Sequence, residues 1–157
     1  MKDKNWMESM KNLSAIRLFC SLYLRKARKG AAASAQEVDL LFRTALAAGT
    51  LTPLEVSHQM GISKTIVSRL IDNLAGKRLV EKLYSTEDKR SYFLKITEAG
   101  KKELDTMYYY YLGPLYDLKE HLGKDDYTEL IRLIQKANES MISQTSGSNE
   151  IIHHIEE

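Results

Sequence analysis

The side chains best suited to bind another molecule gather between residues 63 and 69. Four polar or basic residues recur there at the spacing of one helix face: Lys64, Thr65, Ser68 and Arg69. Their ammonium, hydroxyl and guanidinium groups are donors that reach phosphate oxygens and the edges of bases. Ser63 is a favoured N-cap, and the open N–H groups at the start of a helix suit a phosphate. The pattern predicts a helix that contacts nucleic acid, although such residues also occur on plain solvated helix faces.

A second charged cluster, Glu87-Asp88-Lys89-Arg90, separates two short segments rich in β-favouring residues, "LVEKLY" and "SYFLKI". Apolar and polar positions alternate in the second segment, so the two segments predict a β-hairpin with the charges at its tip. Lys89 and Arg90 would then reach a neighbouring groove of a duplex or its phosphates. The alternative is a surface ion pair of Arg90 with Asp88 or Glu87, worth about 0–1 kcal/mol.

Two short helices are predicted to position the first cluster. Thr52 as cap, Pro53 at the first helical position and Glu55 three residues after the cap start the first helix, and Gly61 ends it. A turn then leads into the second helix, at residues 63–75. The apolar side of this second helix consists of Ile66, Val67, Leu70, Ile71 and Leu74. This arrangement is typical of a helix-turn-helix, whose second helix can lie in a DNA major groove.

Two charged positions in this region call for partners. Asp72 puts a negative charge on the donor-rich side of the second helix, and we expect it to pair with Arg69 three residues earlier or to lie beyond the groove. Lys77 and Arg78 follow the end of that helix. They are predicted to interact with the helix dipole instead of reading bases.

Longer helices are predicted on either side of these elements. An apolar repeat predicts a helix over 6–27, and Ser34 with Glu37 forms a capping box for a helix that runs to about Ala48. Thr97 is expected to cap a helix that breaks or kinks at Gly113-Pro114, because proline lacks an N–H and its ring clashes with the preceding turn. A last helix is predicted from about Gly123 to Ser143.

The net charge of +2 hides an uneven distribution along the 157 residues. Residues 1–30 carry +6, 31–60 carry −2, 61–95 carry +4 and 96–157 carry −6. A basic region beside an acidic one favours a surface that meets a polyanion, although solvated helix faces produce similar charge blocks. The length suits one domain. Because the sequence contains neither an apolar run of about 18 residues nor a secretory signal, we expect a cytoplasmic protein with no membrane partner.

Few residues suggest other chemistry. The single cysteine, Cys20, precludes an internal disulfide and a multi-thiolate metal site, and it is expected to act as a small hydrophobe. His153 and His154 lack further ligands at metal-binding spacing, so we expect neither a metal nor a cofactor. There is no nucleophile with a partner and no Gly-rich phosphate loop, which argues against an enzyme. Of the four consecutive tyrosines, Tyr108 and Tyr111 are the candidates for lining a small-molecule pocket.

These motifs resemble the multiple antibiotic resistance regulator (MarR) family of bacterial winged-helix transcription factors. The resemblance rests on "VSHQMGISKTIVSRLIDNLAGKRLVEK" and "STEDKRSYFLKITEAG", and most specifically on Asp88-Lys89-Arg90. It implies that Arg90 enters the minor groove while Asp88 holds the loop. The phrase "KITEAG" after the second strand is also family-like.

The resemblance further implies a mainly α fold with a small β-hairpin, and a homodimer. The expected organisation of residues 1–157 is a single domain, with dimerisation helices at 1–30 and 98–143, a winged helix-turn-helix lobe at 34–97 and a polar tail at 144–157. In the dimer the two recognition helices would lie about 34 Å apart on a near-palindromic site. Members of the family often bind small aromatic or phenolic effectors, and a peroxide-sensing branch carries a reactive cysteine in its first helix, where Cys20 lies.

We therefore expect a homodimeric transcriptional regulator, acting as a repressor, that binds double-stranded DNA and is released by a small aromatic or phenolic molecule. One alternative is a protein-interaction module whose basic face docks an acidic partner. The other is a redox-sensing regulator acting through Cys20.

Overall fold

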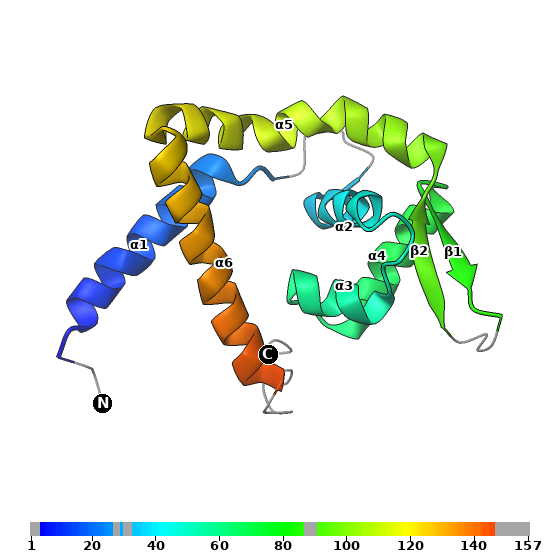
Figure 1. The fold of residues 1–157 in the computed structure, drawn as a ribbon, viewed down its shortest axis with the longest axis horizontal. Coiled ribbons are helices and arrows are strands. Elements are labelled where there is room, and N and C mark those ends of the chain that lie inside the picture. The colour runs from blue at the N-terminus through cyan, green and yellow to red at the C-terminus, as the bar shows by residue number, and fades with distance from the viewer. Residues whose placement is uncertain (1–3, 27–28, 30–32, 87–90, 147–157) are drawn as a thin grey trace.

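The computed structural model describes residues 4–26, 29, 33–86 and 91–146. Within them the chain forms six helices and one antiparallel hairpin (Figure 1). In chain order the elements are α1 (Trp6–Tyr23), α2 (Ala35–Leu46), α3 (Pro53–Met60), α4 (Lys64–Gly76), β1 (Val80–Tyr84), β2 (Tyr92–Ile96), α5 (Glu98–Leu122) and α6 (Lys124–Ser146). The fold class predicted from the sequence is thus confirmed.

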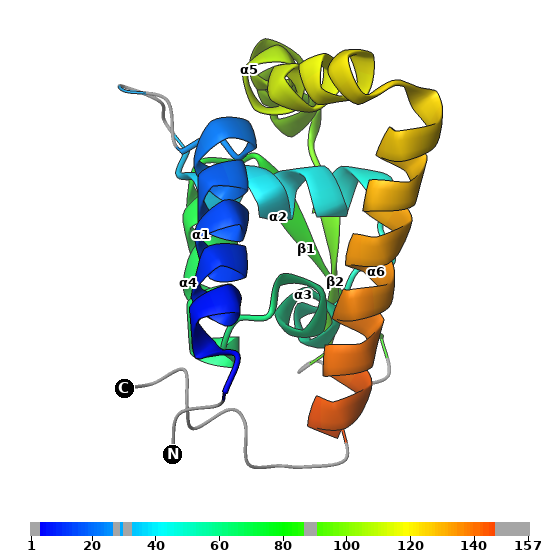
Figure 2. The same ribbon diagram turned by 90° about the vertical axis from the view of Figure 1, so that its left-hand side faces the viewer.

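The molecule consists of a lobe and two arms. Helices α2, α3 and α4 and the hairpin gather at one end of α5, while α1 and α6 lie below its other end (Figure 1). A view from the side shows α1 and α6 as separate arms (Figure 2). The lobe contains the main core, whereas α1 buries none of its own residues. Within the described residues, no helix is long and apolar enough to cross a membrane.

Side-chain caps fix where the helices of the lobe begin. Ser34 and Thr52 form reciprocal capping boxes with the glutamates three residues later, as predicted. Ser63 accepts the Ile66 N–H at the start of α4, and Thr97 accepts the Gly100 N–H at the start of α5. Since each hydroxyl satisfies a backbone donor that the helix itself leaves open, the sequence dictates these boundaries locally.

The core of the lobe lies between α2, α3, α4 and the hairpin. The side of α4 predicted to be apolar faces this core, with Val67, Leu70, Ile71 and Leu74 buried. Ile66, the fifth residue of this side, is partly buried against the same core, and the opposite side of α4 is left at the surface. The core therefore determines which side chains of α4 can reach another molecule.

The hairpin pairs Val80 with Ile96 at its base and Tyr84 with Tyr92 near its tip. Leu94, fully buried in β2, also pairs with Leu51, whose carbonyl accepts the Leu94 N–H at 2.8 Å. This bridge attaches the hairpin to the segment between α2 and α3. A single bridging residue has no alternating pattern, so the sequence could not reveal it.

The first two helices end earlier than predicted. We expected α1 to reach Ala27, but it ends at Tyr23, because Leu24 is extended with φ −97° and ψ 115°. The next residues bind α5 instead: the Tyr110 hydroxyl donates to the Lys26 carbonyl at 3.2 Å. Helix α2 ends at Leu46, two residues before the expected Ala48, which has a positive φ of 50°.

Of the break or kink predicted at Gly113-Pro114, the break was wrong, because α5 continues through both residues to Leu122. Proline cannot donate to the carbonyl four residues earlier, which destabilises a helix interior. Pro114 and Leu118 are nevertheless buried, and their packing offsets the lost bond. Helix α6 also extends to Ser146, slightly beyond the predicted Ser143.

Candidate nucleic-acid interface

The exposed side of α4 presents the donors predicted from the sequence. Lys64, Thr65, Ser68 and Arg69 are all exposed, and Ser63 is partly exposed at the cap. Within the described part of the chain, the side chains of these four exposed residues form no hydrogen bond and no ion pair with another residue. These side chains therefore need not break any intramolecular bond to bind a ligand, which favours their use as contacts.

The tip of the hairpin lies outside the described residues, and with it Asp88, Lys89 and Arg90. The roles predicted for these three residues remain predictions. The described part of the hairpin is paired up to the tip, since the Ser85 N–H donates to the Ser91 carbonyl at 2.9 Å. Figure 1 shows the hairpin running away from the start of α5, beside the lobe helices.

The expected pairing of Asp72 with Arg69 was wrong. Asp72 accepts a hydrogen bond from the Lys82 ammonium of β1, with Nζ 2.7 Å from Oδ1. That ammonium also lies 5.2 Å from the centre of the Tyr92 ring. The hydrogen bond that Lys82 donates to Asp72 raises the pKa of the lysine, so Lys82 is charged at neutral pH. A contact between an α4 residue and a strand residue ten positions later is invisible to helix periodicity.

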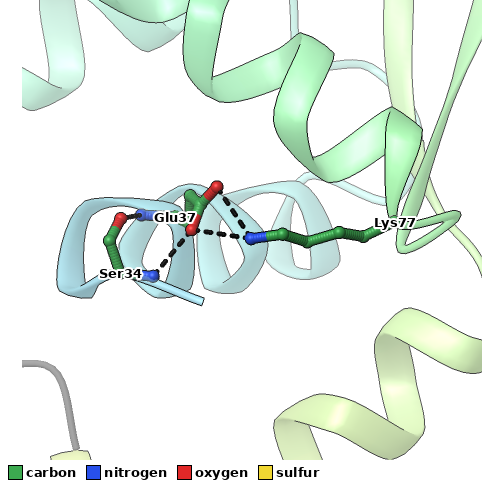
Figure 3. A network of polar contacts seen from close by, with 3 residues as sticks. All are labelled: Ser34, Glu37 and Lys77. Atoms are coloured by element: carbon green, nitrogen blue, oxygen red, sulfur yellow. Dashed lines mark hydrogen bonds and ion pairs between the residues drawn. The ribbon is translucent and has the colours of Figure 1, made fainter. Parts of the chain in front are cut away.

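Glu37 and Lys77 form a second connection that sequence reasoning missed (Figure 3). The Lys77 ammonium, at the C-terminal end of α4, lies 3.0 Å from both carboxylate oxygens of Glu37 in the first turn of α2. Glu37 also accepts the Ser34 N–H at 2.6 Å. Lys77, expected only as a partner of the helix dipole, thus joins two helices. One carboxylate serves both as cap and as ion-pair partner.

The environment of Glu37 controls its ionisation. Its side chain is only 5% exposed, and burial alone would raise the pKa of the carboxyl group. The hydrogen bond from the Ser34 N–H and the nearby Lys77 ammonium outweigh burial, so the pKa lies below its ordinary value. Glu37 is therefore charged at neutral pH despite its buried position.

A cavity of about 220 Å³ lies where α1, α2 and α5 meet. Its apolar lining includes Tyr23, Leu24, Val38, Phe42, Tyr111 and Leu115. Arg25 and Asp39 provide charges at its wall. Tyr111 lies at this cavity, whereas Tyr108 does not line it and is 39% exposed. The two tyrosines are three residues apart, and their shared helical spacing did not bring both to the cavity.

The remaining candidates lie apart from these sites. Cys20 is exposed on α1. Among the described residues, no three histidine, cysteine, aspartate or glutamate side chains lie close enough to hold a metal ion. His153 and His154 fall outside the described residues.

Together, α3, the turn at Gly61, α4 and the following hairpin define a winged helix-turn-helix. No protein-family model matches the chain. A curated relative, the uncharacterized HTH-type transcriptional regulator YwaE of Bacillus subtilis, is 27% identical over 93 residues, which are 59% of this chain and 54% of that protein. The chain thus matches about half the length of this relative.

Solved structures identify the type of winged helix. The crystal structure of a MepR-like protein complexed with pseudoligands has a TM-score of 0.63 and 16% identity, covering 90% of this chain and 99% of that chain. A mutant MarR from E. coli complexed with operator DNA has a TM-score of 0.62 and 22% identity, covering 87% and 99% of the two chains. The chain therefore has the MarR-type fold, and the resemblance seen in the sequence is confirmed by the fold.

Proposed function

We propose that the chain is a MarR-type transcriptional regulator, acting as a repressor, that binds double-stranded DNA through α4 and the hairpin. The observation that carries this proposal is the set of exposed α4 donors that have no hydrogen-bond or ion-pair partner among the described residues, on a helix whose other side packs in the core. The shared fold with a MarR bound to operator DNA supports it. The proposed activity is binding, with no enzymatic step.

Two kinds of contact are expected at this interface: contacts to phosphates, which position the protein, and contacts to bases, which read the sequence. Residues 61–95 carry a net charge of +4, which suits attraction to phosphates and implies salt-sensitive binding. The N-terminal end of α4 offers Ser63 and open backbone N–H groups to a phosphate. Ser68 and Arg69 lie further along the exposed side, where side chains in a major groove reach base edges.

Removing single donors should separate these roles. We expect Arg69→Ala and Ser68→Ala to weaken operator binding and relax base preference, with a cost of about 1–3 kcal/mol for Arg69→Ala. Arg90→Ala should weaken binding to many sequences alike. Fluorescence anisotropy with the chain's own upstream duplex and a scrambled duplex, at several salt concentrations, measures both effects.

A matched control for this experiment is Lys136→Ala, which removes an exposed positive charge from α6, away from the lobe. It should leave binding nearly unchanged. If Arg69→Ala, Ser68→Ala and Arg90→Ala all behave like the control, α4 and the hairpin are not the DNA-binding surface. If the unmodified chain shows no salt-sensitive binding to any upstream duplex, the proposed function itself is wrong.

We also propose that the arms form a homodimer. Helix α1 exposes Met10, Leu13 and Ile16, and α6 exposes Leu133, Ile134 and Met141. Apolar stripes of this size on two helices are typical of an interface. Residues 1–30 and 98–143 would then serve dimerisation, 34–97 DNA binding, and 144–157 would form a polar tail, with two α4 helices spaced for a near-palindromic site.

Charge placed on the α1 stripe should break this assembly. Ile16→Asp is expected to give a monomer and at least tenfold weaker operator binding, because each half-site would then be bound alone. Size-exclusion chromatography with light scattering measures the mass directly. A stable monomer of the unmodified chain at micromolar concentration would contradict the proposed dimer.

The cavity beside Tyr111 supports a further proposal, that a small aromatic or phenolic molecule releases the protein from DNA. Its apolar lining and its two charged groups, Arg25 and Asp39, match the composition of small-molecule sites. One similar protein, the MepR-like protein, was solved with pseudoligands. Phenolic compounds added to the anisotropy assay test this proposal, and it fails if none of them weakens binding.

A further inference from the structure

Asp72 of α4 and Lys82 of β1 form an ion pair that connects the helix to the strand. Asp72 lies three residues after Arg69 and seven after Thr65, so it shares the exposed side of α4 with these donors. A negative charge on that side would repel phosphates. Instead, the Lys82 ammonium holds it at 2.7 Å.

Lys82 is placed firmly by its own strand. It pairs across the hairpin with Leu94, which is fully buried and is itself bonded to Leu51. Its ammonium lies over the ring of Tyr92, which packs against the core of the lobe. The ion pair therefore links the exposed side of α4 to a strand that is anchored to the core. The tip of the hairpin continues from this strand.

We propose that Asp72 and Lys82 are positioning residues, which set the hairpin relative to α4 so that both can contact one duplex. This inference rests on the proposed function. In this arrangement Lys82 acts through Asp72 and does not contact phosphate, although it is a basic residue close to the DNA-binding side.

The sign of one substitution distinguishes positioning from simple electrostatics. Asp72→Asn removes a negative charge from the DNA-facing side, so electrostatics alone predicts tighter binding. Loss of a positioning contact predicts weaker binding instead. Because the side chain of Asp72 is 61% exposed, the ion pair adds little to folding stability, and the variant should remain folded.

The test is a double-mutant cycle in the anisotropy assay, with thermal unfolding measured in parallel. We expect Asp72→Asn and Lys82→Met each to weaken operator binding about three- to tenfold, and the double variant to be no weaker than either single one. The salt dependence of Lys82→Met should match that of the unmodified chain, whereas loss of a phosphate contact would lower the slope by about one. Lys82→Arg, which keeps the charge, should restore most of the affinity.

The same hairpin offers a matched control. Glu81 pairs with Lys95 at 3.1 Å, across the two strands and without a link to α4. Glu81→Gln removes the same charge as Asp72→Asn and should leave binding unchanged or slightly tighter. Tighter binding of Asp72→Asn, or additive effects in the cycle, would overturn the positioning role while leaving the proposed function intact. Failure of the unmodified chain to bind DNA would instead reject the proposed function.

Discussion

Gly100→Ala is expected to destabilise the folded chain by about 3 kcal/mol, because the added methyl group has no room. Gly100 lies in the first turn of α5, beneath the backbone that enters β1. A Cβ atom at this position would clash with the Leu79 carbonyl oxygen and would lie 2.7 Å from Cγ1 of Ile96. That oxygen also accepts the Thr97 N–H at 3.1 Å, so it cannot move without loss of the bond.

Gly113→Ala is the matched control in the same helix. A Cβ atom at Gly113 would meet nothing within 4 Å, and alanine is the better helix former. The free energy of unfolding of this variant should therefore rise by about 0.5–1 kcal/mol. Urea unfolding followed by circular dichroism measures both changes. Equal stability of the two variants would show that α5 does not pack on Leu79 as closely as described. A loss of stability in Gly100→Ala alone would explain why glycine occupies this position in "TEAG": the Leu79 backbone leaves no room for a side chain.

Glu37→Ala should have the second largest effect on folding. The substitution removes the carboxylate that accepts from the Ser34 N–H and from the Lys77 ammonium. Loss of one partner of a buried ion pair costs about 3–5 kcal/mol, and partial access of Lys77 to water reduces this to about 2–3 kcal/mol. Chemical unfolding at pH 7 measures the loss. The matched control is Glu55→Ala, which breaks the same kind of capping box at the exposed start of α3 and should cost much less.

Acid should remove the same stabilisation. Because the pKa of Glu37 is lowered in the folded chain, its contribution is complete above the ordinary value of 4.5 and is lost as the pH falls through the folded pKa. The free energy of unfolding of the unmodified chain should therefore fall more steeply below pH 4.5 than that of Glu37→Ala. Parallel pH profiles would show that the ion pair contributes nothing to stability.

Local signals predicted the lobe well. The capping residues Ser34, Thr52, Ser63 and Thr97 satisfy donors within three residues, so their effect is encoded in short segments. The apolar side of α4 was equally clear, because burial of one helix face imposes a period on the sequence. These two signals were enough to place the candidate DNA-binding donors at the surface.

Contacts between distant residues were not predictable in this way. Lys77 bonds Glu37 forty positions earlier, and Lys82 holds Asp72 against the expectation of an Arg69 partner. In both cases several lysines and carboxylates were available, and only the packing of α2, α4 and β1 selects among them. The helix through Pro114 was missed for the same reason, because the local cost of proline was visible but its burial was not.

Because α5 is one continuous helix, it connects the lobe directly to α6. Its 25 residues span roughly 37 Å from Glu98, just after the hairpin, to Leu122. The next residue, Gly123, has a φ of 78° and separates α5 from α6. Over this length, a small change in the angle between α5 and α6 at Gly123 moves the lobe end of α5 by a large distance. In a dimer joined by its arms, the reach between the two lobes would therefore be governed by the angle at this joint.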